Sequence, residues 1–290
     1  MSKESLGPLV SIIINCYNGE KYLKEAIDSI YIQSYPNWEI VFWDNASTDN
    51  SPIIAKCYDK KLRYFLAKKH STLGVARNLA LKEARGDYVA FLDCDDLFLP
   101  DKIKIQYSEM QENNAVLSYG GWTKIDEKGE ELSVHKIAKK FGNQFESLLS
   151  KYIVNSQTIM IDNNFLIHNN MNFDEKLSFS TDHNLVLRIA LHSPLLAIDK
   201  ILAKYRVHDN SMSSTKKIDK INDFNYTINF FKEQGIQDKY INFELIALKA
   251  KYSLLLLDSI DEKKYWSLPK LFLQYSIYSV KHFLTIIKKY

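Results

Sequence analysis

Short apolar runs alternate with amphipathic segments along the N-terminal third of the chain. The runs are rich in β-branched and aromatic residues, as is typical of strands buried on both faces of a parallel sheet. Between them, apolar residues recur three and four positions apart, which indicates helices with one buried face. The expected strands are 10–14, 38–43, 62–66 and 88–92, and the expected helices cover 20–33, a segment beginning at Ser51, and 74–84. This alternation predicts an α/β fold with a mainly parallel sheet and crossovers on both faces.

The pattern changes twice further along the chain. From about Pro100 to Asp174 it is less regular, and after Lys216 it becomes entirely helical. We therefore expect a sheet domain over residues 1–215 and a helical region over 216–290. The later elements that the pattern predicts are strands 116–122, 157–161 and 198–205, a hairpin turn at 126–130, and helices 182–191, 219–234, 242–257 and 268–290.

Polar side chains follow three of the expected strands at the point where each strand ends. They are Asn15-Cys16-Tyr17-Asn18, Asp44-Asn45 and Asp93-Cys94-Asp95-Asp96. In an open α/β sheet, ligands bind beyond the carboxyl ends of the strands. The three polar ends are therefore expected to converge on one site.

The Asp-x-Asp sequence at residues 93–95 suits a hard divalent cation, because such ions prefer oxygen ligands and can in turn hold a diphosphate. Unpaired carboxylates are costly to bury, so a strand that delivers three of them usually gives them a cation. The alternative is a polar turn in which Asp95 or Asp96 caps the helix after Pro100. The motif alone leaves both interpretations open.

The other polar strand ends suit a nucleotide. Tyr17 offers a ring for stacking on a base, Asn15 offers polar edges, and Asp44 could accept hydrogen bonds from uracil or ribose. Arg77 and Asn78, near a helix start, could meet phosphates or bridge to the Asp-x-Asp carboxylates. No Gly-x-Gly-x-x-Gly, P-loop or Gly-x-Ser-x-Gly sequence is present, which argues against a dinucleotide fold, a P-loop enzyme and an α/β-hydrolase.

Composition adds limits to this picture. The chain has 290 residues and a formal charge of +3, too small to indicate a nucleic-acid partner. Its cysteines, Cys16, Cys57 and Cys94, lack Cys-x-x-Cys spacing, so free thiols in a reducing cytoplasm are the simplest interpretation. The start shows no signal peptide, and no apolar run reaches the roughly 18 residues of a membrane span. We expect a cytoplasmic protein, soluble or peripheral on the inner face of the membrane.

The C-terminal segment is basic. Residues 263–290 contain six lysines and His282 but no Asp or Glu. The helix expected at 268–290 could pack on the sheet domain, or it could lie in a membrane interface, with lysines meeting anionic lipid and tyrosines at headgroup level. The sequence leaves both open.

Four blocks of the sequence resemble the family 2 glycosyltransferases, inverting enzymes with the GT-A fold. The blocks are residues 10–18, 43–49, 74–78 and 91–96, and the resemblance covers roughly residues 9–212. Each block alone is weak, but four in this order and spacing are specific. The resemblance implies a GT-A catalytic domain, with a mostly parallel sheet flanked by helices, followed by a C-terminal helical extension.

The resemblance also implies roles for single residues. Asp182 matches the general base that faces the acceptor, although its place at a helix N-terminus would favour an Asp there in any case. The implied nucleotide-binding residues are Asn15, Tyr17, Asp44, Arg77 and Asp93. The implied ligands of Mg²⁺ or Mn²⁺ are Asp93, Asp95 and His208, with Asp95 the more direct. His208 belongs to a Tyr-Arg-x-His segment, but a hydrogen-bonded loop histidine is an equal alternative.

Two positions depart from the family pattern. Thr181 stands where many members carry Glu, and Asn45 stands where a second Asp is frequent. Neither departure removes a charge that the implied mechanism requires.

The function implied is transfer of a single sugar, with inversion, from a UDP-sugar to a hydroxyl of a saccharide acceptor. Such a reaction would serve the synthesis of a surface polysaccharide, a lipooligosaccharide or a lipid-linked glycan. The alternative is a catalytically inactive protein on the same fold that binds sugar nucleotides or glycans. A nucleotidyltransferase is disfavoured, because no Gly-rich loop with a trailing Arg and Lys follows the first strand.

Overall fold

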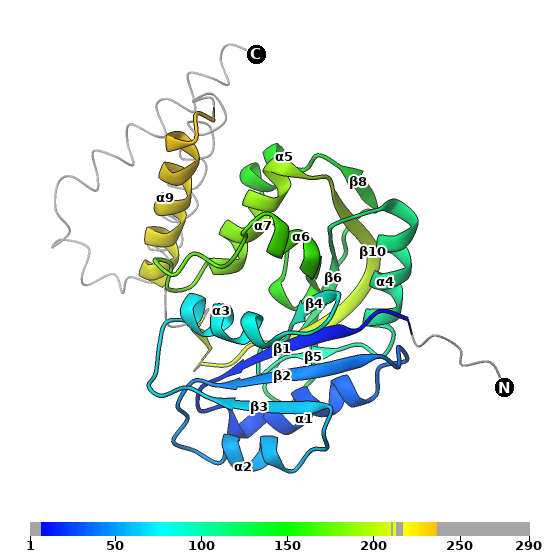
Figure 1. Ribbon diagram of the computed structural model, residues 1–290, viewed down its shortest axis with the longest axis vertical. Coiled ribbons are helices and arrows are strands. Elements are labelled where there is room, and N and C mark those ends of the chain that lie inside the picture. Colours follow the sequence, from blue (N-terminus) through cyan, green and yellow to red (C-terminus); the bar gives the residue numbers. More distant parts are fainter. Residues whose placement is uncertain (1–6, 210, 213–216, 237–290) are drawn as a thin grey trace, which may run out of the picture. The chain divides into compact units, whose positions relative to one another are not determined.

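The computed structural model describes residues 7–209, 211–212 and 217–236 (Figure 1). The chain divides into two compact units between Asp223 and Phe224, and the first unit carries the sheet. The helix expected at 219–234 is confirmed as α9 (Lys217–Glu233). The helices expected at 242–257 and 268–290, and the basic segment 263–290, lie outside the described residues. Within the described part of the chain, no helix is both long and apolar enough to cross a membrane.

The first unit is built on one ten-stranded sheet with the order β3-β2-β1-β4-β9-β6-β10-β5, to which β7 adds beside β6 and β8 beside β10. Its strands are β1 (Val10–Cys16), β2 (Trp38–Asp44), β3 (Leu62–Leu66), β4 (Tyr88–Phe91), β5 (Leu97–Phe98), β6 (Leu117–Ile125), β7 (Glu131–His135), β8 (Lys140–Gly142), β9 (Met160–Asp162) and β10 (Leu195–Arg206).

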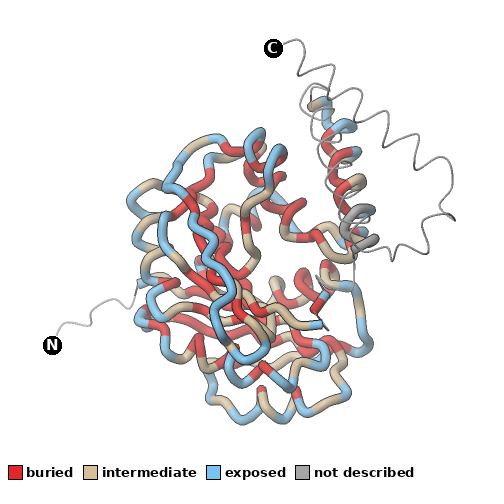
Figure 2. Tube along the Cα trace, turned by 180° about the vertical axis from the view of Figure 1, so that it is seen from behind, coloured by how far each residue is buried: buried red, intermediate tan, exposed pale blue. Residues whose placement is uncertain are grey.

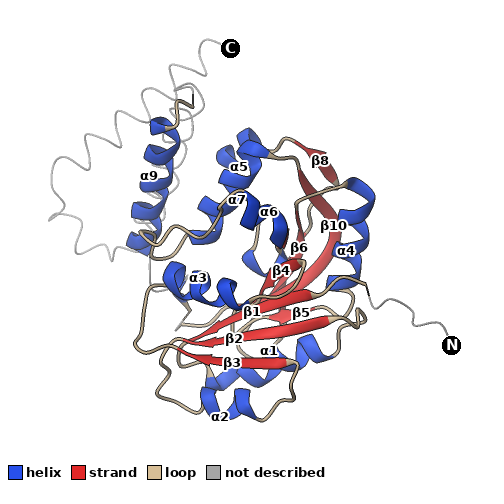
Figure 3. Ribbon diagram, in the orientation of Figure 1, coloured by secondary structure: helices blue, strands red, loops and turns tan. Residues whose placement is uncertain are grey.

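Helices cover both faces of the sheet, as the crossover pattern predicts. In Figure 3, α1 and α2 lie on one side of β1–β3, and α3, α6 and α7 lie on the other. The helices of the first unit are α1 (Glu20–Tyr31), α2 (Ser51–Lys56), α3 (Leu73–Glu83), α4 (Lys102–Asn113), α5 (Phe145–Ser150), α6 (Asn163–His168) and α7 (Thr181–His192), with a 3₁₀ helix at Ser156–Thr158.

The sheet is mixed. The pairs β1–β2, β2–β3, β1–β4 and β6–β10 are parallel, so the parallel prediction holds for the first four strands. The remaining pairs are antiparallel, and each of them includes a strand that follows β4 in the chain. The short strands β5, β7 and β8 carry too little apolar pattern to be predicted.

One predicted strand is only partly correct. The expected strand 157–161 begins with the 3₁₀ helix Ser156–Thr158, and β9 starts at Met160. The side chain of Asn155 accepts a hydrogen bond from the Gln157 backbone N–H, which stabilises a turn where the apolar pattern alone indicates extended chain. The hairpin turn expected at 126–130 is confirmed, with Gly129 at a φ of 87°.

The core explains why β1 sits centrally. Ile12 and Ile14 are fully buried and join a cluster with Leu23 and Ile27 of α1. Figure 2 shows buried residues following the strands and the inner faces of the helices. Parallel register places Cys16 beside Asp44 and Ile13 beside Phe91. The carboxyl ends of β1, β2 and β4 therefore meet at one edge of the sheet.

Lys102, in the first turn of α4, is buried in this core and only 1% exposed. Its Nζ lies 3.5 Å from the carbonyl oxygen of Ile159 and 4.2 Å from the centroid of the Phe98 ring. No carboxylate of the described residues forms an ion pair with it. Burial lowers the pKa of the Lys102 ammonium to about 7.

Replacing this lysine should therefore stabilise the fold in a pH-dependent way. Between pH 7 and 10.5 the unfolded chain binds the Lys102 proton more tightly than the folded chain, so wild-type stability rises with pH over that range. We expect Lys102→Met to raise the free energy of unfolding by roughly 2–4 kcal/mol at pH 7, with a gain that shrinks toward pH 10. Urea unfolding at pH 7, 8.5 and 10 measures this, with exposed Lys104→Met as control. A gain independent of pH would contradict it.

Candidate functional site

The Asp-x-Asp turn directly continues β4 at the edge where the strands end. The Leu92 N–H donates to the Ile13 carbonyl at 3.0 Å, which extends the β1–β4 pairing up to Asp93. The helix that follows begins at Lys102 with Asp101 at its N-cap. Asp95 and Asp96 therefore do not cap that helix, and the polar-turn alternative in that form is wrong.

Asp93 is held by two side chains from distant segments. Arg77 Nη2 of α3 lies 3.2 Å from Asp93 Oδ1, and Gln157 Nε2 lies 2.6 Å from Asp93 Oδ2. The Asp93 backbone N–H also donates to Gln157 Oε1 at 2.9 Å. The carboxylate is 37% exposed, so it faces solvent while both oxygens are oriented.

Asp95 pairs with His208, which lies two residues beyond β10. The distance between Asp95 Oδ2 and His208 Nε2 is 3.0 Å. Among the described residues, His208 is the side chain that bonds the Asp95 carboxylate. Burial and the nearby Asp93 charge raise the pKa of Asp95, and the contact with His208 opposes that rise.

The Asp95–His208 pair suits a divalent cation whose remaining ligands come from a bound substrate. Within the described ranges no group of three His, Cys, Asp or Glu side chains could enclose a metal ion. Mg²⁺, however, is usually bound by one or two carboxylates together with substrate phosphates rather than by a full protein cage. One carboxylate beside an imidazole nitrogen is a donor set of that kind.

Asp96 differs from its two neighbours. It is 1% exposed, and its Oδ1 accepts a hydrogen bond of 2.7 Å from the Arg206 backbone N–H. Burial, with the charges of Asp95 and Asp93, raises the pKa of Asp96 well above its ordinary value. Asp96 thus anchors the turn to β10.

Asp182 lies in the first turn of α7 and is half-buried. Tyr152 donates its O–H to Asp182 Oδ2 at 3.3 Å, and Arg77 Nη1 donates to the neighbouring Thr181 Oγ1 at 3.0 Å. Burial raises the pKa of Asp182, while the Arg77 charge and the Tyr152 hydrogen bond oppose the rise. Arg77 thus joins the start of α7 to Asp93.

The space beside Arg77 and Asp182 on the core side is small. A cavity of about 10 Å³ there is lined mainly by Phe91, Phe173 and apolar residues of β9 and α7. That volume holds about one water molecule. This cavity is therefore too small for a sugar.

The residues expected to bind a nucleotide lie at the ends of β1 and β2, but they are not equally accessible. Tyr17 is 47% exposed and its ring centroid lies 4.1 Å from that of His70. Asn15 is half-buried, and its buried Nδ2 has no hydrogen-bond partner among the described residues. Asp44 is fully buried, where it accepts hydrogen bonds from Tyr64 and the Ser47 backbone. The Asp44 carboxylate therefore supports the turn after β2.

Arg77 and His208 contact the Asp-x-Asp turn at the end of β4, and Arg77 links that turn to the start of α7, where Asp182 lies. Comparison with protein families then identifies the chain. The model of glycosyl transferase family 2 matches residues 11–177. The chain belongs to this family.

Two curated relatives are similar to this family 2 glycosyltransferase over most of its length. An uncharacterized glycosyltransferase of Rickettsia felis is 37% identical over 88% of this chain and 42% of its own. A Bacillus subtilis protein provisionally named teichuronic acid biosynthesis glycosyltransferase TuaG is 33% identical over 72% of this chain and 83% of its own. The chain thus spans less than half of the R. felis relative.

Solved structures show the same fold. Staphylococcus aureus TarS 1–349 in complex with UDP-GlcNAc superposes with a TM-score of 0.68 at 20% identity, over 93% of this chain and 79% of that one. The mannosyltransferase PcManGT of Pyrobaculum calidifontis, in complex with GDP-Man and Mn²⁺, gives a TM-score of 0.63 at 17% identity, over 94% and 86%. The fold of this family 2 glycosyltransferase is therefore GT-A.

Sequence reasoning missed three side chains that hold the site of this glycosyltransferase. Gln157 and Tyr152 contact Asp93 and Asp182 from 64 and 30 residues away along the chain. Arg206 contacts the Asp95 backbone from 111 residues away. No local spacing links residues so far apart. The Tyr-Arg-x-His segment, which contains Arg206, is the one signal that could have pointed to it.

Gln157 offers a test of how Asp93 is held. Gln157→Leu removes both hydrogen bonds to Asp93 and should lower the free energy of unfolding by about 1–3 kcal/mol. Gln157→Glu should lower it further at pH 8, because a second carboxylate then faces Asp93, and the extra loss should vanish toward pH 5 as the two carboxyls share a proton. Urea unfolding at both pH values measures this. Equal losses at pH 5 and 8 for the two variants would contradict the arrangement.

Proposed function

We propose that this family 2 glycosyltransferase transfers a single sugar, with inversion, from a UDP-sugar to a hydroxyl of a saccharide acceptor. One observation carries the proposal: Arg77 contacts both Asp93 and Thr181, so the Asp-x-Asp turn and Asp182 belong to the same site. A donor at the turn would then lie within reach of a base at the start of α7. The complexes of TarS with UDP-GlcNAc and of PcManGT with GDP-Man support a nucleotide-sugar donor.

The nucleotide would bind along the ends of β1 and β2. The exposed Tyr17 ring suits stacking on uracil, and the unpartnered Asn15 Nδ2 can donate to a base or ribose oxygen. Asp44 would act through the turn that it supports, unless it exchanges its present partners for the ligand. Arg77 and Asp93 would contact the ribose and diphosphate end of the donor.

A divalent ion would be held by Asp95 and His208, with Asp93 as a further contact. When bound there, Mn²⁺ or Mg²⁺ would supply positive charge next to the diphosphate leaving group. PcManGT was solved with Mn²⁺, which supports this class of ion. Among the three predicted ligands, Asp93 has both oxygens engaged by Arg77 and Gln157, so Asp95 remains the strongest candidate.

Asp182 would act as the general base. Its carboxylate accepts the proton of the acceptor hydroxyl while that oxygen attacks the anomeric carbon from the face opposite the diphosphate. Inversion follows from that direction of attack. The Tyr152 hydrogen bond keeps the carboxylate oriented, and its effect on the pKa of Asp182 favours the ionised form that the reaction requires.

The proposed acceptor is a hydroxyl of a saccharide. The name of TuaG supports a role in a surface polysaccharide, beside the options of a lipooligosaccharide or lipid-linked glycan. We propose that the enzyme works in the cytoplasm, at the inner face of the membrane if the basic segment 263–290 binds anionic lipid. The competing proposal is an inactive sugar-nucleotide or glycan-binding protein on the same fold.

Replacement of Asp182 separates an enzyme from a binding protein. Asp182→Asn should reduce sugar transfer by about 10²–10⁴-fold, because the acceptor hydroxyl loses its base. The Mn²⁺-dependent affinity for UDP, measured by calorimetry, should stay within about threefold of wild type. Exposed Asp199→Asn on β10 serves as control. Unchanged transfer in Asp182→Asn would refute the base, and no transfer by wild type with any UDP-sugar would favour the binding protein.

The pH dependence tests Tyr152. Because Asp182 must be ionised, kcat/KM should rise with pH through its pKa, which burial places above the ordinary Asp value. Tyr152→Phe removes a hydrogen bond that lowers this pKa, so the acidic limb of the kcat/KM profile should move to higher pH. Tyr58→Phe removes a similar Tyr–Asp hydrogen bond, to Asp28 on α1, and should not move it. An acidic limb of the kcat/KM profile that does not move in Tyr152→Phe would contradict the proposed effect of Tyr152 on the pKa of Asp182.

A further inference from the structure

Arg206, the last residue of β10, is a charged side chain that the proposed mechanism leaves without a role. It is 1% exposed and is among the largest fully buried side chains of the described residues. A buried guanidinium is costly unless its N–H groups are satisfied by well-placed acceptors. The arrangement of its acceptors therefore indicates what it does.

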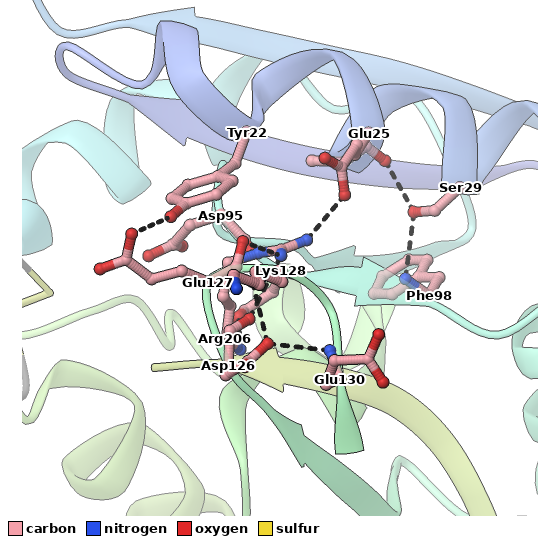
Figure 4. A network of polar contacts seen from close by, with 12 residues as sticks. Tyr22, Glu25, Ser29, Asp95, Phe98, Asp126, Glu127, Lys128, Glu130 and Arg206 are labelled. Atoms are coloured by element: carbon pink, nitrogen blue, oxygen red, sulfur yellow. Dashed lines mark hydrogen bonds and ion pairs between the residues drawn. The ribbon is translucent and has the colours of Figure 1, made fainter. Parts of the chain in front are cut away.

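The guanidinium of Arg206 reaches three separate segments. Its Nε donates to the Asp95 carbonyl oxygen at 3.0 Å, and its Nη2 lies 2.7 Å from Glu25 Oε2 of α1. Its Nη1 donates to the carbonyl oxygens of Asp126 and Glu127, at 3.4 and 3.2 Å, in the β6–β7 hairpin turn. Figure 4 shows Arg206 between α1 and this turn.

The flat face of the guanidinium is also covered. Its Cζ lies 4.5 Å from the centroid of the Tyr22 ring, and the same ring lies 5.2 Å from the His208 ring. Tyr22 therefore packs against Arg206 and His208, which both bond Asp95. The N–H groups of the guanidinium are bonded in its plane, and the Tyr22 ring covers its face. These contacts fix the Arg206 side chain in one conformation.

The end of β10 thus holds the Asp-x-Asp turn through two alternate residues. Arg206 holds the backbone of the turn, through the Asp95 carbonyl and, with its own N–H, through the Asp96 carboxylate. His208 contacts the Asp95 carboxylate. Arg206 thus sets the position of the Asp95 peptide, and His208 contacts the Asp95 side chain.

We propose that Arg206 is a positioning residue for the metal-binding carboxylate of Asp95. The inference rests on the proposed function, since it assumes that Asp95 holds a divalent ion on a nucleotide diphosphate. A small hard cation tolerates little error in ligand position, and groups that orient its ligands typically change metal affinity by 10–100-fold when lost. Arg206 never touches the donor and acts through the peptide of Asp95.

The geometry requires Arg rather than Lys. The three guanidinium nitrogens point in three fixed directions, toward α1, the Asp95 carbonyl and the hairpin turn. A lysine ammonium keeps the charge but offers one nitrogen and cannot reach all three acceptors. Arg206→Lys therefore separates the positioning role from the charge.

The test measures Mn²⁺ affinity directly. For Arg206→Lys, calorimetric titration of Mn²⁺ into protein with saturating UDP should show an affinity lowered about tenfold or more. The Mn²⁺ concentration for half-maximal sugar transfer should rise in parallel, while kcat at saturating Mn²⁺ stays within about threefold of wild type. Circular dichroism below the melting temperature confirms that the variant is folded.

The control is the same substitution at a second ion-paired arginine. Arg63 on β3 also combines ion pairs, with the carboxylates of Glu39 and Glu83, and a hydrogen bond to one backbone carbonyl, of Glu83. Arg63→Lys should leave the Mn²⁺ affinity unchanged even if it lowers the melting temperature. A purely structural role of Arg206 predicts the same result for both variants, and equal Mn²⁺ affinities would overturn the proposal.

A second variant keeps the test decisive if Arg206→Lys does not fold. The Glu25 side chain is 59% exposed, so we expect Glu25→Ala to fold, while it removes the acceptor of Arg206 Nη2. We expect the Mn²⁺ affinity in the presence of UDP to fall about threefold. No change would overturn the proposal. If wild type itself shows no Mn²⁺-dependent UDP binding, the proposed function fails; if wild type binds and the variants bind equally, the positioning role alone fails.

Discussion

The contacts of Arg77 are the constraint on which the site depends. Its side chain is 4% exposed, and its two terminal nitrogens hold Asp93 and Thr181, which come from opposite parts of the chain. Its charge also opposes the effect of burial on the pKa of Asp182. With Thr181 in place of a glutamate, this end of the guanidinium meets a neutral hydroxyl. Asp93 is then the one carboxylate among the described residues that forms an ion pair with Arg77.

The first four strands and the helices between them could be predicted from the sequence. The strands β1 to β4 are apolar runs between amphipathic helices, and their register follows from parallel pairing. The polar residues at their ends are predicted as a group for the same reason. The edge strands β5, β7 and β8 were not predictable, because they are short, and β7 is exposed along its whole length.

The residues of the candidate site also divide into those whose position could be predicted from the sequence and those whose position could not. Asp93, Asp95 and Asp182 could be predicted, because a strand end or a helix start determines where each lies. Gln157 and Tyr152 could not, because glutamine and tyrosine at those positions differ in no local respect from ordinary surface residues. The burial of two carboxylates could not be predicted either. Asp44 and Asp96 lie in acidic strand ends, but tertiary packing turns their carboxylates inward, where they bind other groups of the protein.

The hairpin turn between β6 and β7 is attached to Arg206 through the carbonyl oxygens of Asp126 and Glu127. Every amino acid supplies a carbonyl oxygen, so this attachment does not depend on which side chains the turn carries. Asp126, which accepts the Lys128 and Glu130 N–H groups, and Gly129, with its positive φ, maintain the shape of the turn. The exposed Lys128 side chain is therefore a position at which this surface can be redesigned while the support of the Asp-x-Asp turn is retained, whereas Glu127 also bonds Lys21 and Tyr22.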